Sequence, residues 1–144
     1  MPDWTKLTEA AFEELVFALI SSDPAFGDTE WVYPYANTIR RDISTVRAAT
    51  NSEGRCACLR TLVQCRHPVS GQISFEELML VKEQVALWND PPFDVIVLAT
   101  SGRFTDEAQR WAVVHNAASR KPRFELFSRD KLEQMLTLQT FHLT

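Results

Sequence analysis

The chain has 144 residues, of which 45% are hydrophobic and 24% charged, and a formal net charge of −4. These values are typical of one soluble globular domain and exclude a disordered, collagen-like or disulfide-scaffold protein, so we expect a single domain over residues 1–144. No apolar run approaches the ~18–20 residues of a membrane span. The amino terminus lacks the basic and then apolar segments of a signal peptide, which predicts a cytoplasmic location. The acidic balance argues against a protein that binds nucleic acid over its whole surface.

The amino-terminal half is predicted to contain one helix and one hairpin. Residues 8–21 are expected to form the helix, because Thr8 is a favourable N-cap residue and apolar residues follow at the spacing of one helix face. Residues 22–38 are predicted to be a loop with a short strand near Trp31–Tyr33. Residues 39–66 are predicted to form an antiparallel hairpin, with its turn at 51–54.

The carboxyl-terminal half alternates between predicted helices and strands. We expect a helix over 74–89, a buried central strand over 94–100 and a helix over 105–118. A short strand over 123–127 precedes a last helix that begins after Ser128. This order predicts an α/β domain with a mixed sheet, antiparallel in its first strands and parallel in its later ones.

Cys56 and Cys58 stand two residues apart, with no second cysteine pair and no nearby histidine except His67. An odd number of cysteines without an export signal favours free thiols in a reducing compartment. We therefore interpret the cysteines as small buried apolar residues, and not as ligands of a zinc site.

The predicted hairpin carries most of the positive charge. Residues 39–72 hold six Arg and only two acidic residues, a net charge of +4, whereas residues 1–38 and 73–100 carry −6 and −4. The overall charge of −4 therefore conceals a basic segment in the middle of the chain, where a phosphate group would bind most favourably.

Familiar cofactor and nucleophile motifs are missing from the sequence. It has no G-x-G-x-x-G, no G-x-x-x-x-G-K-[ST], no G-x-S-x-G and no H-E-x-x-H, which argues against a nucleotide cofactor and against common hydrolase sites.

The hairpin can instead bring together Asp42, Gln64 and Arg66. Gln64 and Arg66 are two residues apart on one strand, so their side chains share one face, while Val63 and Cys65 point to the other face. A carboxylate and an amide oxygen suit a hard divalent cation, and an adjacent cation suits a phosphate or an attacking water. This set of side chains suggests metal-assisted phosphodiester hydrolysis, but any strand offers polar residues at this spacing, and a solvated strand face is the simpler interpretation.

Four segments in order resemble the Mrr-like restriction endonuclease domains. Residues 12–16 resemble the F-E-x-L-V helix of that family, and residues 62–66 its L-V-Q-C-K strand. Residues 97–108 resemble its V-x-x-T-S-x-x-F-T-x-x-A segment, and residues 124–132 its closing I-x-L-I-D-x-x-x-L element. The matches extend from about residue 5 to residue 136, nearly the whole chain.

The resemblance implies a restriction-endonuclease-like three-layer fold, with a central mixed β-sheet flanked by helices. It also implies a PD-(D/E)XK nuclease that cleaves DNA with Mg²⁺ or Mn²⁺, in the variant whose motif reads D…Q-x-K. Asp42 matches the metal-binding Asp, Gln64 the amide that replaces the second acid, and Glu13 the helix Glu that supplements the site. A solvated helix position is the alternative interpretation of Glu13.

The sequence departs from this family at two positions. Arg41 stands where the family usually has Gly, and Arg66 stands where it has Lys. An arginine keeps its proton, so Arg66 cannot act as a general base, although its charge can stabilise the attacking water or the transition-state phosphate. The alternative function is therefore a catalytically weakened module that binds nucleic acid or a protein partner without cleavage.

Further contacts to nucleic acid are predicted for Arg41, His67 and Arg103. His67 alternatively only ends its strand, whereas Arg103 precedes a helix amino terminus, a position that attracts phosphates. The family resemblance also implies a DNA partner, a homo-oligomer or an associated sensor subunit, and a role in restriction or phage defence.

Aromatic residues and one histidine give weaker indications. Trp88, Trp111 and a half-buried, hydrogen-bonded His115 are predicted to belong to the core. An aromatic group in the loop after the first helix is expected to line a partner surface, a dimer contact or an adjoining domain: Trp31, Tyr33 and Tyr35.

Overall fold

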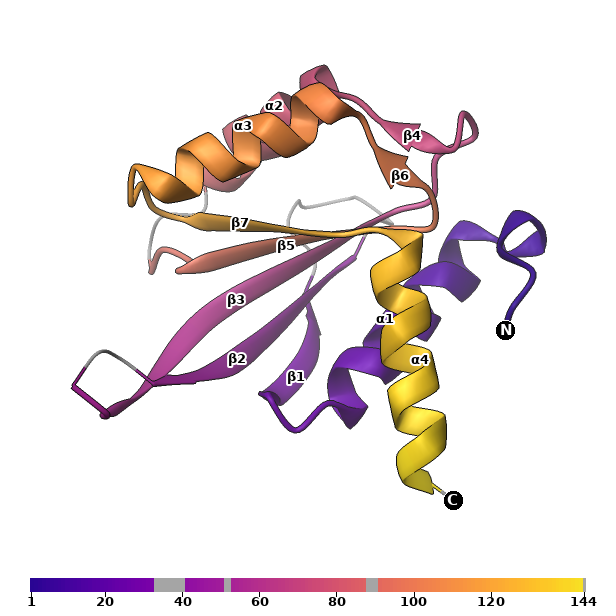
Figure 1. Ribbon diagram of the computed structural model, residues 1–144, viewed down its shortest axis with the longest axis horizontal. Coiled ribbons are helices and arrows are strands. Elements are labelled where there is room, and N and C mark those ends of the chain that lie inside the picture. Colours follow the sequence, from indigo (N-terminus) through magenta and orange to yellow (C-terminus); the bar gives the residue numbers. More distant parts are fainter. Residues whose placement is uncertain (33–40, 51–52, 88–90, 144) are drawn as a thin grey trace.

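The computed structural model describes residues 1–32, 41–50, 53–87 and 91–143, apart from the side chains of residues 56 and 140–143. Its elements, labelled in Figure 1, are η1 (Trp4–Lys6), α1 (Glu9–Ser22), β1 (Phe26–Val32), β2 (Asp42–Thr50), β3 (Cys56–Arg66), β4 (Gln72–Ile73), α2 (Phe75–Ala86), β5 (Val95–Thr100), β6 (Arg103–Phe104), α3 (Asp106–Ala117), β7 (Arg123–Phe127) and α4 (Arg129–Leu143).

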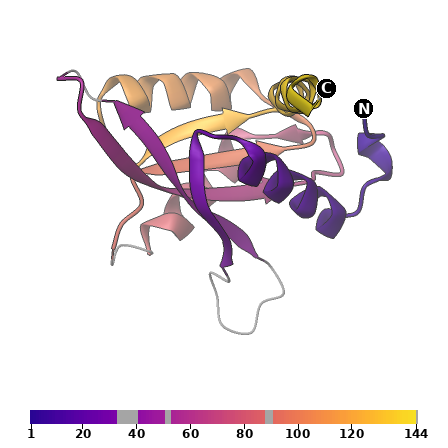
Figure 2. The same ribbon diagram turned by 90° about the horizontal axis from the view of Figure 1, so that it is seen from below.

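The main sheet has five strands in the order β1-β2-β3-β5-β7. Pairs β1–β2 and β2–β3 are antiparallel, while β3–β5 and β5–β7 are parallel. Helices α2 and α3 cover one face and α1 and α4 the other (Figure 1). Viewed from below, α1 and α4 lie next to each other against the twisted sheet (Figure 2). The mixed sheet and three-layer arrangement predicted for this chain are confirmed.

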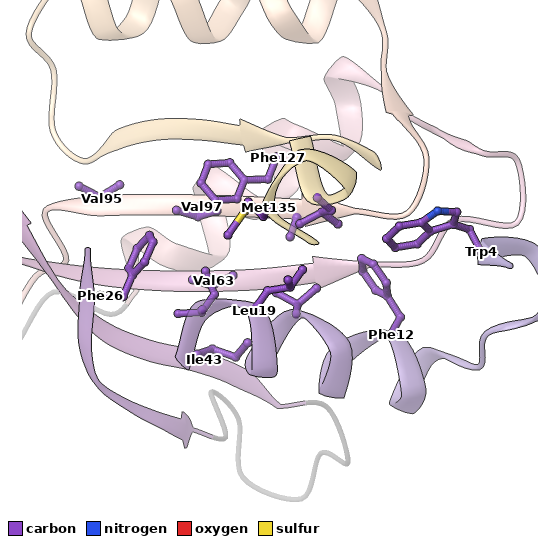
Figure 3. Packing of buried hydrophobic residues seen from close by; sticks show 14 residues of the cluster. Trp4, Phe12, Leu19, Phe26, Ile43, Val63, Val95, Val97, Phe127 and Met135 are labelled. Atoms are coloured by element: carbon purple, nitrogen blue, oxygen red, sulfur yellow. The ribbon is translucent and has the colours of Figure 1, made fainter. Parts of the chain in front are cut away.

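Each face of the sheet has its own hydrophobic core. The core under α1 and α4, shown in Figure 3, includes Phe12, Leu19, Val63 and Val97. The core under α2 and α3 is formed by Leu62, Ile73, Leu78, Val81, Val85, Phe93, Ile96, Leu98, Phe104, Ala108 and Phe124. All six residues of β5 are buried, as expected for a parallel strand with helices on both faces.

Three helices begin within one residue of their predicted starts. The side-chain oxygens of Thr8, Ser74 and Thr105 accept hydrogen bonds from backbone N–H groups three residues on, at 3.0–3.2 Å. These bonds satisfy N–H groups that have no partner within the helix. Helix α2 ends at Ala86, earlier than predicted, and Trp88 lies outside the described residues.

Strand β1 is longer than the sequence indicates. It runs over Phe26–Val32, where we predicted mostly loop with a short strand near Trp31–Tyr33. β1 is an edge strand with several exposed polar residues. Its register with β2 also shifts between Gly27 and Glu30. For both reasons its sequence lacks the alternation of apolar and polar residues by which a strand is predicted. Tyr33 and Tyr35 lie outside the described residues.

The two-stranded sheet formed by β4 and β6 was not anticipated. Each strand has two residues, too few for a periodic pattern. Their parallel pairing joins the segments that precede α2 and α3.

The prediction that the cysteines are buried is wrong for Cys58. This residue is exposed, whereas Cys65 is half-buried against the α1 face. The pairing of β3 with β5 begins only at Thr61 and Val95, so among the described residues no strand pairs with the outer part of β3 on that side. Figure 1 shows this part of the hairpin projecting away from the helices.

His115 and Trp111 both pack against the core as predicted, but His115 is more completely buried than the predicted half-burial and Trp111 is only partly buried. The His115 ring is buried, hydrogen-bonds the carbonyl oxygen of Pro122 through Nε2 at 2.7 Å, and stacks on Trp111 with ring centroids 4.6 Å apart. Within the described part of the chain, no helix is long and apolar enough to cross a membrane.

Candidate functional site at the carboxyl end of β3

The first residue of β2 and the last residues of β3 form the candidate site. The register pairs Ile43 with Val63, so Asp42 lies beside Gln64 on the neighbouring strand. Both side chains point to the α2–α3 face, because Ile43 and Val63 belong to the core on the other face. Asp42 is 1% exposed and Gln64 3% exposed, so two polar side chains are buried at the edge of the sheet.

Asp42, Gln64 and Arg66 form one chain of hydrogen bonds. Gln64 Nε2 donates to Asp42 Oδ2 at 3.1 Å, and Arg66 Nη2 donates to Gln64 Oε1 at 3.1 Å. A guanidinium group only donates and an ionised carboxylate only accepts, so these partners fix which end of the amide faces which neighbour. The structure therefore brings together the three residues that the spacing along the hairpin predicts.

On the other face of the sheet, Arg41 binds two carboxylates of α1. Its Nε donates to Glu13 Oε1 at 2.8 Å, and its Nη2 to Glu14 Oε1 at 3.3 Å. The Arg41 guanidinium carbon lies 3.8 Å from the ring centroid of Trp31, which stacks on Phe17. The hydrogen bond to Glu13, more than any other cause, raises the pKa of Arg41 above its usual value.

Glu13 is therefore held in place by Arg41, the residue that directly precedes Asp42. We predicted Arg41 as a nucleic-acid contact and Trp31 as part of a partner surface. In the structure both take part in this intramolecular cluster with α1.

His67 packs on the α1 side of β3. Its Nδ1 forms a hydrogen bond with Ser101 Oγ, and its ring stacks on Phe12 with centroids 5.6 Å apart. Ser101 is buried and directly follows β5. These contacts anchor the end of β3 to the end of β5, and they place His67 on the face opposite Gln64.

Arg103 lies apart from the Asp42–Gln64–Arg66 chain, in the small two-stranded sheet. It is exposed in β6 and lines an open hollow of about 600 Å³ together with Thr105, Gln109 and Ser128. Asp106 and other residues complete the lining. Among the described residues, no hydrogen bond or ion pair is seen between Arg103 and the Asp42–Gln64–Arg66 chain.

Two residues at this edge were not recognised from the sequence. A Cβ atom on Gly102 would lie 2.3 Å from the carbonyl oxygen of Gly71, so only glycine fits there. Arg129 donates its backbone N–H to the carbonyl oxygen of Gly102 at 3.0 Å and its Nε to that of Ser101 at 2.8 Å. The Ser-Gly-Arg sequence at 101–103 indicates a tight turn, whereas no local sequence pattern indicates the contacts of Arg129.

The donor set at this edge suits a hard cation. Asp42 supplies a carboxylate and Gln64 an amide oxygen on the α2–α3 face, whereas the carboxylate of Glu13 is held on the α1 face by Arg41, the residue before Asp42. Within the described ranges, no three His, Cys, Asp or Glu side chains cluster closely enough to hold a metal. Mg²⁺ keeps several of its waters and needs only one or two protein carboxylates, so the residues present fit Mg²⁺ better than Zn²⁺.

Comparisons with known proteins identify the fold. No protein-family model and no curated protein matches the chain. A solved structure, "DNA modification-dependent restriction endonuclease AspBHI", superimposes with a TM-score of 0.59 at 11% identity, over 91% of this chain and 31% of that one. The chain thus spans about a third of the length of this neighbour. The chain therefore has a restriction-endonuclease-like fold, with a central mixed sheet between two layers of helices.

Proposed function

We propose that the chain is a metal-dependent endodeoxyribonuclease domain that hydrolyses DNA phosphodiester bonds with Mg²⁺ or Mn²⁺. The observation that carries this proposal is the buried contact between Asp42 and Gln64, which continues to Arg66 at the carboxyl end of β3. The fold of the neighbouring restriction endonuclease and the Mrr-like D…Q-x-K resemblance, with Arg66 in place of Lys, support it.

The burial of Asp42 favours a binding role for this carboxylate. Burying a charged group is unfavourable unless other groups compensate it, and Asp42 and Gln64 are almost fully removed from solvent. In the proposed site, the Asp42 carboxylate and the Gln64 amide oxygen would hold the cation, with Glu13 as a supplementary ligand. The chemistry that Mg²⁺ would supply there is the activation of a water molecule as nucleophile, by lowering the pKa of that water.

Arg66 has an electrostatic role in this proposal. Its guanidinium keeps its proton at any physiological pH, so it does not take the proton from water. It lies one hydrogen bond from the amide of Gln64, where its positive charge stabilises the negative charge that develops on the phosphate.

DNA is the proposed substrate because the hairpin that carries this site is a basic segment of the chain. Residues 39–72, which contain the β2–β3 hairpin, carry a net charge of +4 within an acidic chain. We assign phosphate contacts to the outer surface near Arg103, beside the amino terminus of α3. His67, packed on the opposite face, contributes to binding by fixing the end of β3.

A double-strand cut needs a second active site, because one site cleaves one strand in each encounter. We therefore propose that the domain acts as a homo-oligomer or with an associated sensor, in the cytoplasm, in restriction or phage defence.

The second candidate function is a nuclease-fold module that binds DNA or a protein partner without cleaving DNA. The observation that favours it is Arg66 itself, because the proton acceptor that a lysine can provide is missing. This candidate predicts DNA binding that weakens with salt and no cleavage.

Plasmid cleavage distinguishes the two candidates. Wild-type protein, Asp42→Asn and the control Asp28→Asn are incubated with supercoiled plasmid and Mg²⁺ or Mn²⁺. Asp28 is exposed in β1 at a positive φ of 51°, a conformation that Asn tolerates. We expect nicking or cutting by wild type and Asp28→Asn, and a loss of roughly 10²-fold or more in Asp42→Asn.

The other outcomes are equally informative. Cleavage that survives in Asp42→Asn contradicts the assigned site. An inert wild type that binds plasmid in a salt-dependent manner supports the second candidate, and a gain of cleavage in Arg66→Lys then identifies Arg66 as the cause.

A further inference from the structure

Two guanidinium groups bind the oxygens that the proposed metal site needs. Arg66 Nη2 donates to Gln64 Oε1, and Arg41 Nε donates to Glu13 Oε1. Arg41 and Arg66 are also the two positions at which the sequence departs from the Mrr-like pattern. The two departures therefore act on two of the three proposed ligands.

The orientation of the Gln64 amide opposes metal binding beside Asp42. Its Nε2 faces Asp42 Oδ2 and its Oε1 faces Arg66, both at 3.1 Å. An amide nitrogen does not coordinate a hard cation, whereas the amide oxygen does. For Gln64 to share a cation with Asp42, the amide must turn over, which breaks both hydrogen bonds and releases the guanidinium of Arg66.

Glu13 is held by an equally well-defined contact. The Arg41–Glu13 pair is 2.8 Å long, and both side chains are largely shielded, with 21% and 17% exposure. Trp31 covers the guanidinium at 3.8 Å, and Glu14 adds a second carboxylate at 3.3 Å. A cation that takes Glu13 as a ligand must displace Arg41 from this arrangement.

We propose that Arg41 and Arg66 compete with the divalent cation for the oxygens of Glu13 and Gln64, so that the resting site is held closed by two arginines. This inference rests on the metal site of the proposed function and adds its regulation. Metal binding and release of the guanidinium groups are then coupled, and the freed Arg66 becomes available to a phosphate at the same step. Removal of either arginine should therefore tighten metal binding.

Metal binding can be measured without any cleavage assay. Mn²⁺ is titrated into the full chain, and bound metal is followed by calorimetry and by loss of the free-ion paramagnetic resonance signal. Arg66→Met and Arg41→Met remove the guanidinium and keep an apolar stem of similar length. Arg66→Gln and Arg41→Gln repeat the test with polar side chains, in case a Met variant does not fold.

The control variants separate this effect from a general change in charge. Arg110→Met removes one positive charge from an exposed position of α3, and Asp42→Asn removes the central ligand. A hydrogen bond to a charged group contributes enough that its loss changes a competing affinity by about tenfold. We expect Mn²⁺ to bind about tenfold more tightly to the Arg66 and Arg41 variants, with Arg110→Met unchanged and Asp42→Asn non-binding.

Contrary results separate the inference from the proposed function. If wild type binds Mn²⁺ in an Asp42-dependent manner and the arginine variants bind no more tightly, the competition is overturned and the metal site stands. An equal gain in Arg110→Met also overturns the competition, since it would reflect bulk charge. If none of the folded variants binds Mn²⁺, the competition and the metal site are both wrong.

Discussion

The two faces of β3 differ sharply at its carboxyl end. On the face toward α1, Val63 is fully buried in an apolar core and Cys65 packs against it. On the face toward α2 and α3, Gln64 and Arg66 hydrogen-bond to each other and, through Gln64, to Asp42. Neighbouring residues of one strand thus contribute to stability on one face and to a polar site on the other.

This difference shows how a buried polar site can be kept in position. A chain of hydrogen-bonded polar groups contributes little net free energy, so its geometry depends on the apolar face behind it. We therefore expect substitutions in the apolar core on the α1 face to lower stability without a specific effect on chemistry, and substitutions in the Asp42–Gln64–Arg66 chain on the other face to affect both.

The largest expected effect on stability is that of Leu19→Ala, behind the site in the α1-side core. Leu19 is 2% exposed, and truncation of such a leucine costs about 2–5 kcal/mol because it leaves a cavity. The free energy of unfolding is measured in urea, with Leu138→Ala as the matched control. Leu138 is 59% exposed on α4, so its truncation should change stability by about 0.5 kcal/mol or less.

Cleavage per folded molecule should be unchanged in Leu19→Ala. A specific loss of cleavage in this variant, at a temperature where it is fully folded, would contradict the proposal that the apolar core contributes only to stability.

Gln64→Leu should have an intermediate effect on stability and a large effect on cleavage. The variant keeps similar bulk but removes the hydrogen bond that Asp42 receives, at a cost of about 1–3 kcal/mol in the free energy of unfolding. Loss of the amide oxygen should also reduce cleavage by roughly 10²-fold. Gln134→Leu, at an exposed position of α4, is the control for the added apolar side chain.

Unfolding in urea and plasmid cleavage are measured for both glutamine variants. Full activity in Gln64→Leu would show that Gln64 has no role in the proposed chemistry.

The smallest expected effect is that of Arg41→Ala on stability. The Arg41 ion pair with Glu13 and the contact with Trp31 should together contribute about 1 kcal/mol. Because salt screens partly exposed charges, the difference between wild type and variant should shrink from about 0.01 M to about 1 M salt. A loss of several kcal/mol at both salt concentrations would instead make Arg41 a structural residue, comparable with Leu19.

The sequence predicts the regular elements well and their edges poorly. The α1 stripe from Phe12 to Ile20 and the apolar run of β5 follow directly from burial on one face or on two. The polar edge strand β1 and the short pair β4–β6 escape prediction, because their existence depends on neighbouring strands and not on local pattern.

The candidate site is predictable only where strand pairing controls it. The alternation of side chains along β3, together with the hairpin register, places Gln64 and Arg66 beside Asp42. The attachment of Arg41 to Glu13 depends on how α1 packs across the sheet, and this long-range contact leaves no local signal in the sequence.

Gly102 has a consequence for sequence variation. Its backbone lies against Gly71, and its carbonyl oxygen accepts the N–H of Arg129, the first residue of α4. The connections that follow the parallel strands β3, β5 and β7 therefore meet at one residue without a side chain. In relatives that keep this site, position 102 should be restricted to glycine, whereas Gly27, with open space around its Cβ position, should be free to vary.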